Sequence, residues 1–208
     1  MKKIMFALIV SAMCGSTMYA QSSSDQLHIG VKAGVNYSNM YDSQSRDYSA
    51  DGKIGIAAGG FVSIPIGTYF GIQPELLFSQ KGFKATSSVL GSDVSLTRTT
   101  SYIDVPIFFA VKPSEMVTIL VGPQYSFLMK QKDVFSSPIV NNTTIQDFNN
   151  DNIRKNTLCL VTGLDINVSN FVVGARVGWD LFNNNGDGTS TTPRYKNVWA
   201  QATVGLRL

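Results

Sequence analysis

The sequence has few charged residues and very little cysteine or histidine. Charged side chains make up 15% of the 208 residues, and the chain holds two cysteines and one histidine. A typical soluble domain carries ~25% charged residues, so this composition is unusual for a soluble enzyme. Apolar residues reach 44%, which excludes an intrinsically disordered chain. A length of 208 residues is enough for one or two domains with a buried core.

The start of the chain has the order of a secretory signal peptide. Lys2 and Lys3 precede an apolar run over residues 4–13, and small or polar residues lead to Ala20. We expect cleavage after residue 20, a short linker over residues 21–27 and a folded domain over residues 28–208. The alternative is a lipoprotein signal at Cys14, where Met13 stands in place of the expected small residue.

Cleavage removes most of the excess positive charge. The 17 basic residues fall to 15, against 14 acidic residues, because residues 1–20 contain two lysines and no acid. A nearly neutral chain lacks the basic footprint of a nucleic-acid-binding protein. Cys159 is the one cysteine left, so no intramolecular disulfide forms.

Long apolar runs are absent after the signal, which excludes a transmembrane helix. Apolar and polar residues instead alternate with a period of two, the pattern of β-strands. This alternation predicts eight strands, most of them a dozen residues or longer, against a usual ~5 to 6. Their ranges are 28–39, 53–66, 69–83, 98–112, 117–131, 156–168, 171–182 and 196–208.

The connections between these strands alternate between short and long. Three are short, at residues 67–68, 113–116 and 169–170, and four are long and polar, at 40–52, 84–97, 132–155 and 183–195. This layout predicts an eight-stranded antiparallel up-and-down transmembrane β-barrel with short periplasmic turns and long extracellular loops. The protein is then expected in the bacterial outer membrane, in contact with its lipid, with both termini at the short-turn rim.

The two faces of each strand differ in polarity. In "FVVGARVGWDL", residues 171–181, Val173 and Val177 share one face, and Arg176 and Asp180 share the other. Across all strands the first face carries no charge, while the second carries the strand charges and ten glycines. Glycine on a water-facing strand covers nothing but suits a narrow lumen, so the apolar face is expected to meet lipid. The predicted lumen charge network comprises Lys32, Glu75, Asp104, Asp165, Arg176 and Asp180.

Several segments resemble the PorT-like outer-membrane β-barrel family. They are "GVKAGVNYSN", "GFVSIPIG", "GIQPELLFSQKGF", "YIDVPIFFAVKP", "VGPQYSFL" and the final "VGLRL". The likeness extends over nearly the whole mature chain. It implies an outer-membrane barrel, and through one member of the family an accessory role in protein secretion.

The search for catalytic residues identifies none. His28 is the one histidine and opens the first strand, away from the long loops, so we interpret it as a strand-end residue. Glu75 and Asp104 are inward carboxylates on neighbouring strands, which is a pattern for acid–base chemistry. We favour the alternative that they brace the lumen together with Lys32 and Arg176.

One loop contains a weak metal-binding pattern. Asn183, Asn185 and Asp187, followed by Gly188, resemble the first half of a calcium loop. Arg194 replaces the glutamate that closes such loops, and these residue types are common in any loop. We therefore expect no resident metal and no cofactor.

The expected function is non-enzymatic. The barrel wall and lumen are committed to lipid and to internal packing, so we expect the long loops, chiefly 132–155 and 183–195, to contact a surface or envelope protein or to support membrane integrity. The alternatives are an accessory role in secretion, a small channel, or an outer-membrane enzyme with its site at the barrel mouth. A lumen of ~8 strands is normally filled by side chains, which disfavours a porin-like pore.

Overall fold

A computed structural model describes residues 26–42, 50–89, 92–136, 141–146, 156–183 and 195–208. The predicted signal peptide and its cleavage site lie outside these residues. In the described part the secondary structure is all β. The strands are β1 (His28–Asp42), β2 (Ala50–Ile66), β3 (Phe70–Val89), β4 (Ser92–Val111), β5 (Val117–Ser136), β6 (Asn141–Gln146), β7 (Asn156–Val168), β8 (Phe171–Asp180) and β9 (Tyr195–Arg207).

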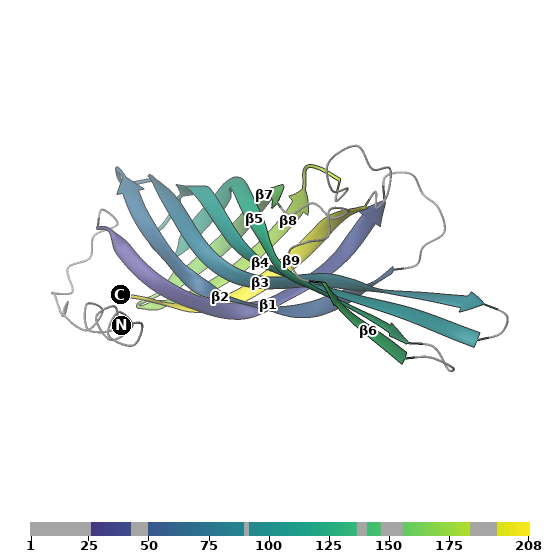
Figure 1. Ribbon diagram of the computed structural model, residues 1–208. Coiled ribbons are helices and arrows are strands. Elements are labelled where there is room, and N and C mark those ends of the chain that lie inside the picture. Colours follow the sequence, from purple (N-terminus) through teal and green to yellow (C-terminus); the bar gives the residue numbers. More distant parts are fainter. Residues whose placement is uncertain (1–25, 43–49, 90–91, 137–140, 147–155, 184–194) are drawn as a thin grey trace, which may run out of the picture.

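Eight of these strands form a closed antiparallel barrel (Figure 1). Each strand pairs with its neighbour along the chain, except that β5 is followed around the ring by β7. The pairing of the first strand with the last, β1 with β9, completes the circle. Closure leaves no unpaired edge within the wall, which is the condition for strands to cross a bilayer. The predicted eight-stranded barrel is confirmed.

The short turns and both ends of the described chain lie at one rim. Gly67 and Ser169 take the positive φ values of 73° and 53° that tight hairpin turns require. At the same rim the Leu208 amide donates to the Ile29 carbonyl at 2.7 Å. The long connections all leave from the opposite rim.

The predicted long loops contain more strand than the sequence suggested, above all residues 84–97 and 132–155. Residues 84–97 are not a loop, because β3 continues to Val89 and β4 begins at Ser92. In the predicted loop 132–155, β5 continues to Ser136 and β6 follows at Asn141–Gln146. The prediction ended strands where apolar alternation ends, but that alternation marks the lipid boundary. Polar, β-branched residues continue as strands in water.

The outer face of the barrel wall is apolar around the ring. Val173, Val177 and Ile166 are 41–49% exposed although they are aliphatic, and no aqueous fold leaves so much contiguous apolar surface open. The exposed apolar residues come from all eight barrel strands. This band is the surface that meets the hydrocarbon of the membrane.

Glycines on the inner face make room for large side chains. A Cβ atom at Gly178 would collide with the ring of Trp199, and one at Gly30 would collide with the ring of Phe61. Both rings are buried, at 2% and 4% exposure. The lumen is therefore filled by side chains, as expected for a barrel of about eight strands.

The prolines within strands do not shift the register. Pro74 and Pro123 cannot donate a backbone hydrogen bond, which would favour a local bulge, yet the register is unchanged across both. A missing N–H removes a hydrogen bond without inserting a residue. The register shifts lie elsewhere, between Gly52 and Ala57 on β2 and opposite Ser101 on β5.

A charge placed on the outer wall tests the position of the hydrocarbon band. Val177→Arg should lower the free energy of unfolding by about 2–4 kcal/mol, since arginine is most costly near the bilayer midplane. The matched variant Ser101→Arg lies beyond the apolar rows of β3–β5 and should cost about 0–1 kcal/mol. Urea unfolding in lipid vesicles measures both, and equal costs would contradict the assigned boundary.

Candidate functional site

The first candidate site is a buried group of charges in the lumen, which we call the Arg176 cluster: Lys32, Gln73, Glu75, Asp165 and Arg176. Arg176 on β8 lies 3.0 Å from both Glu75 Oε1 on β3 and Asp165 Oδ1 on β7. Lys32 on β1 donates to Glu75 Oε1 at 2.6 Å. Gln73 donates to Glu75 and Asp165 at 2.9 and 3.2 Å. The cluster links four strands across the lumen.

The surroundings of the Arg176 cluster fix it in place. The Arg176 guanidinium lies 5.4 Å from the ring centre of Phe108, and Lys32 Nζ lies 4.9 Å from that of Phe61. A Cβ atom at Gly163 or Gly174 would collide with Arg176, so these glycines give the guanidinium its space. The two cations and two carboxylates are buried at 5% exposure or less, and their charges balance.

A second cluster lies nearer the long-connection rim, and we call it the Lys81 cluster: Lys81, Asp104, Ser79, Asp180 and Cys159. Lys81 Nζ lies 3.0 Å from Asp104 Oδ2, which accepts a hydrogen bond from Ser79 at 2.6 Å. Cys159 Sγ donates to Asp180 Oδ1 at 3.0 Å. Asp180 Oδ2 also accepts the backbone and side-chain N–H of Asn197.

Lys81 is the lumen residue that the sequence analysis missed. It is buried at 3% exposure and lies 4.9 Å from the ring centre of Trp199. The signal was present, because Lys81 is an even number of residues from Glu75 on the same strand and therefore shares its face. It was passed over because it falls in "SQKGF", beyond the most apolar part of the strand.

The structure separates the two carboxylates considered for acid–base chemistry. Glu75 belongs to the Arg176 cluster and Asp104 to the Lys81 cluster, and each is ion-paired and at most 3% exposed. Each carboxylate is held by cations and hydrogen-bond donors. The arrangement supports a bracing role for both residues.

The remaining sequence candidates are not gathered into a site. His28 opens β1 at the short-turn rim, opposite Ser63. Asn183 follows β8, while Asn185 and Asp187 lie outside the described residues. Across the described ranges, no group of three His, Cys, Asp or Glu side chains is placed to hold a metal ion. The same ranges contain no helix long and apolar enough to cross a membrane.

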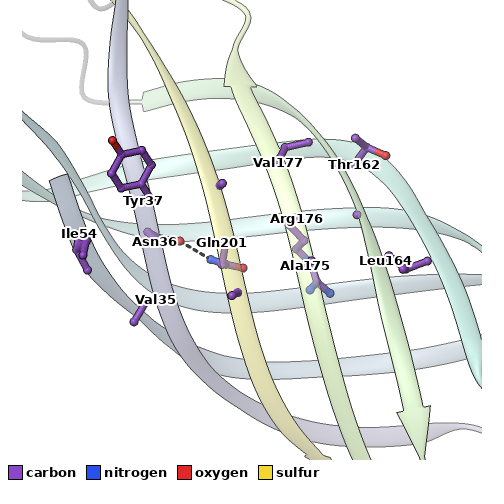
Figure 2. Close-up of a pocket in the computed structure, with 13 residues that line it drawn as sticks. Val35, Asn36, Tyr37, Ile54, Thr162, Leu164, Ala175, Arg176, Val177 and Gln201 are labelled. Carbon is purple, nitrogen blue, oxygen red and sulfur yellow. Dashed lines mark hydrogen bonds between the residues drawn. The ribbon is translucent and has the colours of Figure 1, made fainter. Parts of the chain in front are cut away.

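A shallow depression of about 510 Å³ lies on the outer wall across β1, β2, β7, β8 and β9 (Figure 2). Its floor is formed by Ala175, Ala200 and Ala202, which are small and adjacent across β8 and β9. Larger outward side chains such as Val35 and Leu164 flank them. The neighbouring Asn36 and Gln201 turn inward and hydrogen-bond to each other at 2.8 Å. The depression is an apolar part of the lipid-facing wall.

The family of the chain follows from its sequence. A model of the outer membrane protein beta-barrel domain matches residues 19–185. The chain belongs to this family. No curated protein matches the sequence.

Several solved protein structures resemble this chain at low sequence identity. The chain is similar to Ail, the attachment invasion locus protein of Yersinia pestis, crystallised with the heparin analogue sucrose octasulfate, at 14% identity and a TM-score of 0.50, covering 88% of this chain and 99% of that one. Neisserial surface protein A is 11% identical, with a TM-score of 0.49, and the match covers 86% of this chain and 97% of that one. The outer membrane protein OprG of Pseudomonas aeruginosa is 10% identical, with a TM-score of 0.38, and the match covers 87% of this chain and 95% of that one. At these identities the likeness to Ail supports the fold.

Removing the central arginine tests whether the Arg176 cluster holds the barrel together. Arg176→Ala leaves Glu75 and Asp165 buried without their shared cation, which should lower the free energy of unfolding by about 3–5 kcal/mol. Arg98→Ala is the comparison variant, because its bidentate pair with Asp133 is 17% exposed, so partial hydration should make its loss smaller than that of Arg176→Ala. Equal losses in urea unfolding would show that burial does not distinguish the two pairs.

The two lumen clusters also predict that the barrel does not conduct. Their side chains meet across the lumen from β1, β3, β4, β7 and β8, and they are buried. Purified wild-type barrel in a planar bilayer should therefore give no steady, ion-selective current. A large and stable current would restore the channel interpretation.

Proposed function

We propose that the protein is a non-enzymatic surface barrel that binds another cell-surface or envelope protein through a sheet projecting from its long-connection rim. The supporting observation is that β3, β4, β5 and β6 continue past the barrel wall as one sheet with β6 at its edge. Figure 1 shows the two hairpins β3–β4 and β5–β6 extending away from the barrel. We call this extension the projecting sheet: residues 80–89, 92–101, 130–136 and 141–146.

β6 lies at the edge of the projecting sheet because β5 extends beyond the end of its pairing with β7. The pairing of β5 with β7 ends at Phe127 and Asn156, and its pairing with β6 begins at Gln131 and Gln146. In the described part of the chain β6 pairs with β5 and with no other strand. Within the described residues, the backbone N–H and C=O groups on the other side of β6 therefore have no strand partner.

A free edge outside the membrane supports recognition by strand addition. An extended segment of another protein can pair with β6, gaining backbone hydrogen bonds for affinity and side-chain contacts for specificity. Natural proteins usually protect such edges. Among the residues that the structure describes, the wall faces lipid and the lumen is filled, so the projecting sheet is the part available to a macromolecule.

The finer assignment is to PorT-like barrels exported by a cleaved signal peptide. Supporting it are the segments "ELLFSQKGF", "YIDVPIFF" and "VGPQYSFL", in that order. Under this assignment the partner at β6 is a component of protein secretion. A deletion strain with an unchanged set of secreted proteins would remove that alternative and leave the surface role.

A proline at Thr143 or Thr144, whichever has its N–H on the free edge, tests strand addition at β6. In an antiparallel edge strand successive residues direct their N–H groups to opposite sides, so one of Thr143 and Thr144 faces β5 and the other faces the free edge. Hydrogen exchange identifies the free-edge amide as the faster one. Proline at that position should reduce cross-linking capture of the partner in intact cells about tenfold, since it removes one hydrogen bond of about 1 kcal/mol and adds a steric clash.

The control keeps the backbone donor and changes the side chain. Thr→Val at the same position retains the N–H, so capture should remain, and heat-modified gel migration should show a folded barrel for both variants. Undiminished capture by the free-edge proline variant would refute strand addition at β6.

A further inference from the structure

The outer wall of β3, β4 and β5 changes sharply from apolar to basic along the strands. Phe78, Ile103 and Phe127 form one cross-strand row on the lipid-facing side. The next outward row toward the long connections is Gln80, Ser101 and Lys130. This change marks where the wall leaves the hydrocarbon, because a lysine in the apolar band would be strongly destabilising.

A β-bulge turns two lysines onto this wall. Residues of β5 point inward at even numbers up to Leu128, and at odd numbers from Gln131. The extra residue is Met129, since Ser101 pairs with Lys130 and Tyr102 pairs with Leu128. Without the bulge, Lys130 and Lys132 would point toward the lumen side. The bulge instead leaves both exposed on the outer wall.

Two further lysines join them. Lys53 on β2 donates through Nζ to Thr99 Oγ1, and Thr99 is the cross-strand partner of Lys132. Lys84 pairs with Thr97 in the next row of the same face. We call Lys53, Lys84, Lys130 and Lys132 the lysine platform.

Positive charge on the platform is poorly neutralised. Asp133 is paired with Arg98 on the opposite face, and Asp51 lies beside Lys84. Among the described residues, no carboxylate forms an ion pair with Lys53, Lys130 or Lys132. Burial and the nearby charge of Lys132 lower the pKa of Lys53, which lies beyond the apolar rows. An anion between these ammonium groups would be stabilised.

We propose that the lysine platform binds the phosphorylated headgroup of a lipid in the outer leaflet, with its acyl chains along the row of Phe78, Ile103 and Phe127. The height of the site favours a lipid over a soluble anion, because basic side chains directly above an apolar band face headgroups. Lysine binds phosphate as a compact positive charge with three donors. The site is independent of the partner proposed for β6.

Lipid retention by the reconstituted barrel tests this site. The mature protein is placed in phosphatidylcholine nanodiscs containing either phosphorylated lipid A or the same lipid after enzymatic removal of its phosphates. Native mass spectrometry then measures the lipid kept on the ejected barrel. Wild type should retain the phosphorylated form preferentially. In the variant Lys53→Gln/Lys130→Gln/Lys132→Gln, the ratio of phosphorylated to dephosphorylated lipid retained should fall about fivefold for each lysine replaced.

Two controls keep the test decisive. Lys112→Gln/Arg207→Gln removes two charges at the short-turn rim, and it should retain the wild-type preference. Calorimetry with inorganic pyrophosphate should show much weaker binding than lipid A. The proposal is overturned if wild type has no preference, if the triple variant keeps it, if the control variant loses it equally, or if pyrophosphate binds as tightly as the lipid.

Discussion

Closure of the sheet into a ring, completed where β1 pairs with β9, is the constraint on which the rest of the structure depends. Hydrocarbon offers no hydrogen bonds, so every backbone N–H and C=O of the wall must find its partner in a neighbouring strand. Eight strands satisfy this condition with a lumen that side chains can fill. Once the ring is closed, one face of each strand is assigned to lipid and the other to the interior.

The interior then imposes its own requirement, because charges placed there must be paired. Arg176 is held by Glu75 and Asp165, and Lys81 by Asp104. Removing one member of such a group leaves an opposite charge buried without its partner, so the members of each group depend on one another for stability. Both proposed binding surfaces, the projecting sheet and the lysine platform, accordingly lie where the same strands continue beyond the apolar band.

The sequence predicted the barrel well because a lipid-facing strand carries an unusually clear signal. Val173 and Val177 alternate with Gly174 and Arg176, and the many glycines on the polar face favour a narrow lumen over a water-facing sheet. The facing of Asp165 toward Arg176 also followed from the turn at residues 169–170, because a two-residue hairpin fixes register. Local sequence was sufficient for both.

What the sequence did not predict depends on pairing between distant strands. The strand β6 pairs with the part of β5 that extends beyond β7. The segment "NNTTIQ" alone is typical of a polar loop. The outward position of Lys130 depends on one extra residue, Met129, whose bulge is defined only against β4. The strand register therefore determines which lysines lie on the same face, and register cannot be inferred from composition.

The central claim is that the lumen is a closed, paired interior, and the native thiol tests it most directly. Cys159 points into the lumen, is fully buried and donates to Asp180. In the mature, folded barrel it should resist small thiol reagents such as methanethiosulfonates for as long as the barrel stays folded, and it should react fully after unfolding in denaturant. Modification of Cys159 in the folded protein at the rate of an exposed thiol would show that water and small solutes enter the lumen, and it would contradict the account.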